Sequence, residues 1–377
     1  MSNVLQPLLN EHGQLVVLDE SDFSEDVSSI LADGPVNRKV VRRVLDNISV
    51  AIHDCGDESS EEPQSSKVSD AVGCVIAILD HYSEDTEICA KALSAIEVMT
   101  RHVYKDHRIC EALVKTLHVR ACVSRSFIAD QEYRKGFNSL IPNEIKGCDG
   151  LWRDVFDYIY PAERAGFRLV LHCLHIIREL TRSNTIANRN SLISAGLCEI
   201  ISSLLRTHSS NPTIVHECCK ASIVLAHAGR DRLVLAGACR GLVEAVAAHV
   251  DISSNAVNGC RAIYSLSLNI VEGRRELVKA GACELLVNLI NNHLNDKDVV
   301  REGCLAIYRL SFESPENKKI FFKASFCEAL MLVYRSYGQS NEINVRGLVR
   351  DFIFENDAIT NRFIELGASS VLPGLHL

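Results

Sequence analysis

The chain has 377 residues, 47% of them hydrophobic, and a formal net charge of −8, a length that fits two ordinary domains or one elongated repeat array. Residues 1–66 hold thirteen Asp/Glu against four Lys/Arg, a net charge of −9, so the remaining 311 residues carry about +1. Neither part has the strongly basic balance of a protein whose main task is to bind a phosphate backbone, so we expect no nucleic-acid partner.

Membrane insertion and secretion are not expected either. The longest apolar run, VGCVIAIL at residues 72–79, is much shorter than the roughly 18 residues that a membrane helix needs. The start MSNVLQPLLNEHG lacks the basic residues and cleavage site of a secretory signal. We therefore expect a protein of the cytoplasm or the nucleus. Fifteen cysteines, an odd number spread over the whole chain, do not indicate a disulfide framework in that setting.

The N-terminal third is irregular. Residues 1–35 are predicted to form an acidic, largely flexible arm that includes LDESDFSEDVSSI at residues 18–30. A capping helix is predicted over residues 36–53, and the composition of DESSEEPQSS at residues 57–66 predicts a flexible loop. One hypothesis is that the arm occupies a basic groove on the rest of the chain. The alternative is a solubilising tail.

Residues 36–123 are predicted to form degenerate repeats. EICAKALSAIEVMT (87–100) is typical of a third helix in a repeat, and KDHRICEALVKTLHV (105–119) of the helices that follow it. Residues 124–164 are either an insertion or a further degenerate repeat. Their Pro, Gly and clustered aromatic residues favour an insertion.

A regular period begins near residue 165. Four similar segments each have cysteine at the fourth position: AGLCEIISSLL (195–205), AGACRGLVEAV (236–246), AGACELLVNLI (280–290) and ASFCEALMLVY (324–334). Three columns recur at spacings of 41 and 44 residues: Cys198, Cys239, Cys283 and Cys327; Cys219, Cys260 and Cys304; His208, His249 and His293. Independent columns that share one irregular spacing indicate a stacked helical array.

One period contains three predicted helices. A short helix ends at Ala-Gly, where Gly281 can adopt the left-handed conformation that closes a helix. A second helix is predicted over residues 282–292, with Cys283 on its buried face. After a polar turn, a third helix is predicted over residues 298–312.

These residues resemble the armadillo repeats, whose units read Asn-x-x-x-(Leu/Val)-x-x-Ala-Gly-(Gly/Ala)-(Ile/Leu)-(Pro/Glu)-x-Leu and end in a helix with Ala-Leu-x-Asn-Leu-Ala. AGACELLVNLI and GCLAIYRLS carry the resemblance, which covers residues 165–377. It implies an all-α fold, a right-handed α-solenoid of roughly six three-helix repeats, with a C-terminal cap that contains a turn at Gly367.

The pattern of cysteines and histidines does not predict a disulfide, a metal site or a catalytic centre. Equivalent helices in a stack lie roughly 8–10 Å apart, whereas a disulfide needs alpha carbons within about 7 Å and two sulfurs on one zinc lie about 4 Å apart. We therefore expect the cysteines to be small core residues, and the histidine column to mark the exposed end of the second helix. VHECC (215–219) lacks zinc-ligand spacing, and no nucleotide, zinc-protease or serine-hydrolase motif is present. We expect no enzyme, no metal, no cofactor and no small-molecule substrate.

The resemblance implies that the third helices line a binding groove. The family's groove asparagine aligns with Val98, Glu179, Val224, Ser265 and Arg309, and its tryptophan with Ser94, His175, Lys220, Arg261 and Leu305. None matches, which disfavours peptide binding of the importin kind. Helical spacing nevertheless groups basic and aromatic residues on this face: His175, Arg178, Glu179, Arg182, Lys220, Val224, His227, Arg261, Tyr264, Ser265, Leu305, Tyr308, Arg309 and Phe312. One interpretation is that this face has no binding function, is solvated, and has its tyrosines packed between repeats.

The functional interpretation is a non-catalytic scaffold or adaptor for protein–protein interaction. It would bind an acidic or acidic-hydrophobic segment of a partner protein along this groove. The alternatives are a nuclear-transport-type adaptor and a regulator of a signalling enzyme, and the least favoured is a metal- or thiol-dependent enzyme.

Overall fold

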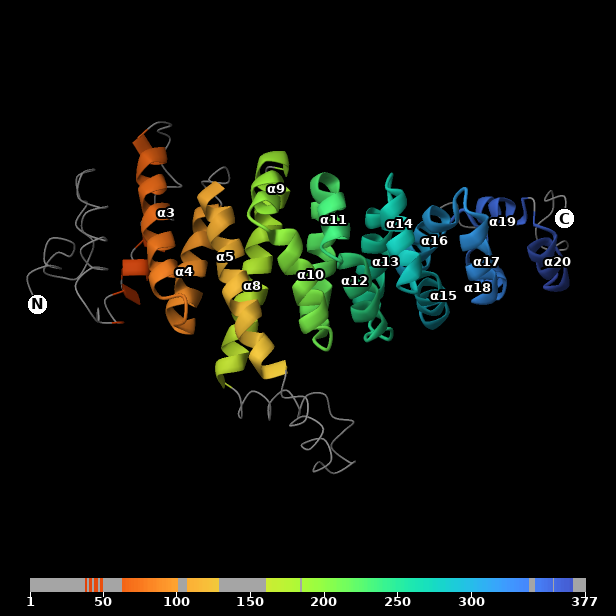
Figure 1. The fold of residues 1–377 in the computed structure, drawn as a ribbon, viewed down its shortest axis with the longest axis horizontal. Helices are drawn as coiled ribbons and strands as arrows, with labels where there is room; N and C mark the ends of the chain where they lie inside the picture. The colour runs from red at the N-terminus through yellow and green to blue at the C-terminus, as the bar shows by residue number, and fades with distance from the viewer. Residues whose placement is uncertain are drawn as a thin grey trace, which may run out of the picture. The chain divides into compact units, whose positions relative to one another are not determined.

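All regular structure that the chain shows in its described residues is helical (Figure 1). The computed structural model describes residues 63–100, 107–128, 161–183, 185–338, 343–354 and 356–368, with helical positions at 38, 41, 42, 44–46, 48 and 49. These last positions fall in the predicted capping helix. The acidic arm, residues 1–35, lies outside the described residues.

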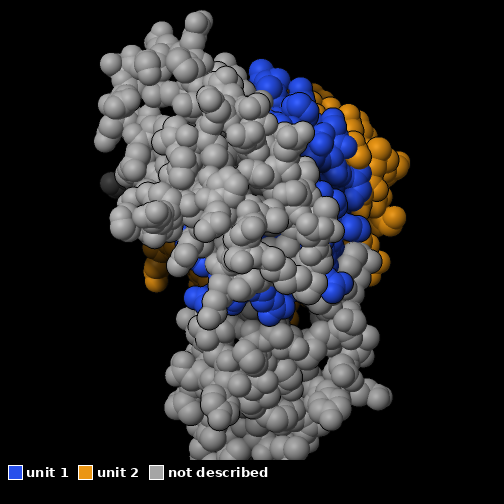
Figure 2. All heavy atoms as spheres, turned by 90° about the vertical axis from the view of Figure 1, so that its left-hand side faces the viewer, with its two compact units in different colours: residues 1–200 blue, residues 201–377 orange. Residues whose placement is uncertain are grey.

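The chain divides into two compact units, residues 1–200 and residues 201–377 (Figure 2). Residue 165, where the regular repeats were predicted to start, lies within the helix Pro161–Ser183 of the first unit. The helices of the first unit are α3 (Pro63–His81), α4 (Thr86–Thr100), α5 (His107–Ile128), α8 (Pro161–Ser183) and α9 (Thr185–Ser194), and α10 (Leu197–Thr207) begins in it.

The first unit places α4 directly against α8, and α5 packs against both α3 and α8. The choice between an insertion and a degenerate repeat for residues 124–164 stays a prediction. Residues 129–160 lie outside the described residues. Helix α3 begins at Pro63, so residues 63–66 are helical and not part of the predicted loop. Proline is well suited to the first helical position because its nitrogen has no proton to leave unpaired there.

The second unit repeats a short first helix, a second helix and a long third helix. Its helices are α11 (Pro212–Leu235), α12 (Ala238–Ala247), α13 (Ser253–Ser267), α14 (Val271–Lys279), α15 (Ala282–Asn292), α16 (Lys297–Ser311), α17 (Pro315–Lys323), α18 (Phe326–Tyr337), α19 (Val345–Ile353) and α20 (Asp357–Glu365). Helix α11 contains one third helix and the next first helix, joined at a kink where Gly229 has φ −130°. Third helix α13 packs against α11 and α16, and α16 packs against α19. The predicted all-α fold of armadillo-type three-helix repeats is confirmed.

A left-handed residue separates the first and second helices of each repeat, as predicted for Gly281 and Gly367. Both have positive φ, 92° and 83° respectively. One repeat has Ser325 at this position, with φ 62°. Because a side chain crowds the backbone in the left-handed region, this serine carries strain that the glycines avoid.

We expect Ser325→Gly to raise the free energy of unfolding by about 1 kcal/mol, because it relieves this strain. The Ser325 side chain makes no capping hydrogen bond, so nothing is lost. Ser336→Gly, at an exposed position inside the same helix α18, should instead lower stability by about 0.5–1 kcal/mol. Chemical denaturation should show that the free energy of unfolding rises in Ser325→Gly and falls in Ser336→Gly. An equal change in both variants would contradict the assignment of strain to Ser325.

The cysteine columns belong to the core, as predicted. The cysteines of both columns are free thiols at buried positions. Burial raises the pKa of Cys219 and Cys304 to about 12, and it raises the pKa of Cys283 as well. These thiols are therefore protonated at neutral pH and pack as small apolar groups.

Cys283→Ser is expected to cost about 1–3 kcal/mol, because it places a hydroxyl where the buried thiol needed no hydrogen bond. Cys283→Val keeps an apolar side chain of similar size and should cost less than about 1.5 kcal/mol. Thermal unfolding of both variants would check the order. A serine variant as stable as the wild-type chain would refute the core role.

The histidine column follows the ends of the second helices as predicted, but the predicted exposure is wrong for His208, which is buried, and His249 and His293 are half-buried. His208 is buried, and burial lowers its pKa to about 4. Nε2 of His249 donates to the carbonyl oxygen of Ser209 at 2.7 Å, and Nε2 of His293 donates to that of Val250 at 2.6 Å. These acceptors lie in the turn of the preceding repeat, so the histidines tie neighbouring repeats together.

The same tie occurs one repeat later with a different residue. The hydroxyl of Tyr337, 44 positions after His293, donates to the carbonyl oxygen of Leu294 at 2.9 Å. This position therefore requires a side chain whose terminal hydrogen-bond donor reaches the turn of the preceding repeat. It does not require histidine.

Candidate binding face on the third helices

The predicted groove residues lie in two different units, which are described separately. His175, Arg178, Glu179 and Arg182 are on α8 of the first unit, and the others are on α11, α13 and α16 of the second or directly follow α16. All reach the surface at least partly except Ser265, which is only 7% exposed. Its position was predicted from the family's groove asparagine, but its side chain is buried, and its carbonyl oxygen accepts a hydrogen bond from Arg230. We call Lys220, Val224, His227, Arg261, Tyr264, Leu305, Tyr308, Arg309 and Phe312 the third-helix face of the second unit.

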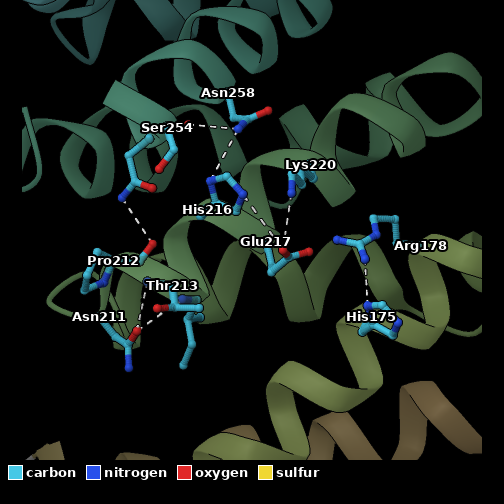
Figure 3. A network of polar contacts seen from close by, with 12 residues as sticks. His175, Arg178, Asn211, Pro212, Thr213, His216, Glu217, Lys220, Ser254 and Asn258 are labelled. Atoms are coloured by element: carbon cyan, nitrogen blue, oxygen red, sulfur yellow. Dashed lines mark hydrogen bonds and ion pairs between the residues drawn. The ribbon is translucent and has the colours of Figure 1, made fainter. Parts of the chain in front are cut away.

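In the first unit, carboxylates accompany the predicted basic residues. Oε2 of Glu97, on α4, lies 2.9 Å from Nε2 of His172, and Oε1 of the same residue lies 3.7 Å from Nε2 of His175. Arg178 donates to Nδ1 of His175 at 2.6 Å (Figure 3).

Glu179 lies within ion-pair distance of two arginines on the same helix. Its carboxylate is 3.4 Å from Nε of Arg178 and 3.5 Å from a terminal nitrogen of Arg182. With Glu97, it makes this part of the groove a mixed-charge surface rather than the basic one that was predicted.

In the second unit, two basic residues of the face are likewise paired. Lys220 lies 3.4 Å from Glu217 (Figure 3), and Nε of Arg261 lies 3.1 Å from Glu302 of the next third helix. Neither glutamate was predicted to pair with these basic residues, although the sequence contains a pattern that indicates both positions. They form a column with Asn258 at spacings of 41 and 44 residues, directly before the Cys/Gly positions of the third helices.

Arg230 and Arg309 donate hydrogen bonds to oxygen atoms that carry no charge. Nε of Arg230 donates to the carbonyl oxygen of Ser265 at 2.7 Å, and Arg309 donates to Oδ1 of Asn269 at 3.3 Å. Burial lowers the pKa of Arg230; the charge of Asp231 opposes this shift, and the smaller effect of the Arg309 charge acts in the same direction as burial. We call Arg230 and Arg309 the arginine pair.

The arginine pair offers unused hydrogen-bonding capacity to a ligand. Nε of Arg309 is buried and has no hydrogen-bond partner among the described residues. Neither arginine forms an ion pair with a carboxylate in the part of the chain that the structure describes. The sequence analysis missed Arg230 because it lies beyond the Gly229 kink, outside the helical register used for the groove.

Aromatic and aliphatic side chains adjoin the arginine pair. Leu305 and Tyr308 are 43% and 37% exposed, and the rings of Tyr308 and Phe312 lie 5.6 Å apart between centroids. A cavity of about 730 Å³ opens beside them, between α16 and α19. The face thus combines partly exposed apolar groups with guanidinium groups.

The described residues contain no cluster of three or more His, Cys, Asp or Glu side chains that could hold a metal ion. Within the same residues, no helix has the length and apolarity needed to cross a membrane.

No protein-family model and no curated protein matches this chain. Among solved structures it is similar to an engineered protein at 16% identity and a TM-score of 0.48, covering 94% of this chain and 93% of the other. A designed armadillo repeat protein in complex with the peptide (KR)4 has 16% identity, a TM-score of 0.43, and coverage of 86% and 99%. A structure from work on the interaction between cadherin and beta-catenin has 15% identity, a TM-score of 0.41, and coverage of 88% and 64%.

Proposed function

We propose that the chain is a non-catalytic protein-binding scaffold, and that the third-helix face of its second unit takes an acidic segment of a partner protein. The observation that carries this proposal is the arginine pair. The charge of Arg309 acts to lower the pKa of Arg230, against the larger opposing effect of Asp231, and no described carboxylate forms an ion pair with either arginine. A carboxylate from a partner would relieve this repulsion and accept the unused guanidinium hydrogen bonds.

The neighbouring side chains suit protein recognition. Tyrosine and arginine are enriched among the residues that dominate binding energy in interfaces. Tyr308 directly precedes Arg309 on α16 and is 37% exposed, and its ring lies against the ring of Phe312. A basic peptide, as a nuclear-transport-type adaptor would bind, is disfavoured here because Glu217 and Glu302 are already paired with Lys220 and Arg261.

The test is affinity capture with the full chain. Arg230→Gln combined with Arg309→Gln removes both charges but keeps hydrogen-bond donors for Ser265 and Asn269. We expect this double variant to bind the captured partner at least about tenfold more weakly, since each charged hydrogen bond contributes about 1.5–3 kcal/mol.

Lys279→Glu on the short helix α14 is the control, because its side chain is 75% exposed and distant in sequence from the face. It should keep every partner. If the folded double variant also keeps every partner at unchanged affinity, the proposal is wrong.

A further inference from the structure

A cavity of about 730 Å³ lies between α16 and α19, where the repeat is irregular. Helix α16 has 15 residues, whereas α19, the third helix of the next repeat, has only 9. Because these repeats are 44 residues apart, Val345 at the start of α19 corresponds to Arg301, one turn inside α16. Leu305 and Tyr308 of α16 line the cavity and are 43% and 37% exposed.

The walls that α19 contributes are largely apolar as well. Ile343, Leu348 and Phe354 line the cavity from this helix and its flanks, and Phe354 is 67% exposed. Cavities of roughly 300–1,000 Å³ enclose a drug-sized ligand. This one therefore has room for one or two large apolar side chains of an inserted segment.

The cavity lies where an ion pair between third helices is lost. At the preceding junction, Nε of Arg261 on α13 lies 3.1 Å from Glu302 on α16. The residues 44 positions later are Leu305 and Arg346. The junction between α16 and α19 thus has an apolar residue in place of the arginine and a cation in place of the carboxylate. The charge that neutralises the preceding junction is missing from this one.

Two of the charged residues that line the cavity already have partners within the chain. Arg301 is paired with Asp298 at 2.9 Å and with Glu302 at 3.1 Å. The carboxylate of Asp351 lies 3.7 Å from Nζ of the buried Lys318. Neither residue therefore determines the charge that an occupant meets.

Two arginines of α19 remain for an occupant. Arg350 lines the cavity, and Arg346 lies one turn earlier on the same helix; both are exposed. Neither forms an ion pair with any carboxylate that the structure describes. Their spacing of four residues places both guanidinium groups on one face of α19.

We propose that this cavity binds a segment of a partner protein in which a bulky apolar side chain has Asp or Glu within one helical turn of it. The apolar side chain would pack against Leu305 and Phe354, and the carboxylates would pair with Arg346 and Arg350. A basic segment would meet two like charges. A segment with carboxylates alone would leave the apolar walls in contact with water.

This inference rests on the proposed function and specifies the partner segment further. The cavity adjoins the third-helix face through Leu305 and Tyr308, which belong to both. On that face the arginine pair selects for negative charge. The cavity adds a requirement for a large apolar residue, so an acidic segment without one would bind more weakly.

The test selects peptides on the full chain from a phage-displayed library of random twelve-residue sequences. We expect the selected peptides to share a Phe, Trp, Leu or Ile with at least two Asp or Glu within four positions of it. On a full chain with Arg346→Glu and Arg350→Glu, the selected peptides should instead have Lys or Arg beside the apolar residue, because the charge at the cavity is reversed.

The most enriched peptide, labelled with fluorescein, then serves as the probe in fluorescence polarisation. Leu305→Ser, or Arg346→Glu with Arg350→Glu, should weaken probe binding at least about tenfold. The matched controls are Leu332→Ser and Arg335→Glu on α18. Leu332 is 41% exposed, Arg335 is exposed, and neither lines the cavity, so both controls should leave probe binding unchanged.

Selected peptides without the shared apolar and acidic residues, or no enrichment of any peptide, would overturn the proposal. Probe binding that survives both cavity variants would overturn it as well. The proposed function is tested separately by Arg230→Gln with Arg309→Gln, and neither residue lines the cavity. If that variant loses its partner while the cavity variants change nothing, the proposed function stands and only this inference fails.

Discussion

Phe352→Ala should lower the free energy of opening of helices α17–α19 by about 3–5 kcal/mol, the usual cost of removing a fully buried phenylalanine. Phe352 is fully buried, and its ring centroid lies 4.3 Å from that of Phe326 and 5.9 Å from that of Phe321. These three rings come from three successive helices, so alanine would leave a cavity that none of them can fill alone. Native-state hydrogen exchange of amides in these helices would measure the loss.

The effect should be local. In repeat proteins each repeat contacts mainly its neighbours, so destabilisation concentrates near the altered repeat. Phe354→Ala is the matched control, because that ring is largely exposed and its loss should change stability by less than about 0.5 kcal/mol. Equal effects of the two substitutions would contradict the described core of the C-terminal repeats.

Gly273→Ala is expected to cost about 3 kcal/mol, at the upper end of the usual cost of overpacking, because the new methyl group meets backbone rather than a movable side chain. A Cβ at Gly273 would overlap the carbonyl oxygen of Leu266, at the end of the preceding third helix. In the next repeat the equivalent residue is Asn317, whose side chain donates to the carbonyl oxygen of Leu310 at 2.6 Å. The repeat with glycine has no space for that side chain.

Gly166→Ala makes the same chemical change at a site inside α8 where a Cβ would meet nothing within 4 Å. There alanine should raise stability by about 0.5–1 kcal/mol through its higher helix propensity. Thermal or chemical unfolding of the two variants should thus give opposite shifts. A destabilised Gly166→Ala variant together with a stable Gly273→Ala variant would refute the contact.

The repeat architecture could be predicted because each feature recurs. The second helix predicted over residues 282–292 coincides with α15, and the third helix predicted over residues 298–312 differs from α16 by one residue at each end. Glycine before the cysteine column identified the left-handed junctions because few other residues adopt that conformation without strain. Upstream of residue 165 a single copy of each pattern was available, so residues 124–164 could not be assigned to an insertion or to a repeat.

The charge of the groove could not be predicted from one helix at a time. Helical spacing selects residues that share a face, but Arg261 is neutralised by Glu302 from the following repeat. The histidine column failed for the same reason, since His249 and His293 reach the turn of the preceding repeat. Arg230 was missed because the kink at Gly229 moves it out of the helical register. The partners of these side chains lie in neighbouring repeats. The spacing of residues within one repeat therefore does not predict which partner each side chain has.

The most direct test of the binding face is site-specific photo-crosslinking in cells. The full chain would carry a benzoylphenylalanine in place of Tyr308, beside the arginine pair, or in place of Leu235, an 84% exposed residue at the end of α11. We predict that the substitution at position 308 gives a discrete crosslink to a partner protein, that Arg230→Gln with Arg309→Gln abolishes it, and that position 235 gives none. Crosslinking at position 235 but not at position 308, or a crosslink at 308 that survives loss of both arginine charges, would contradict a partner held by an acidic segment on this face.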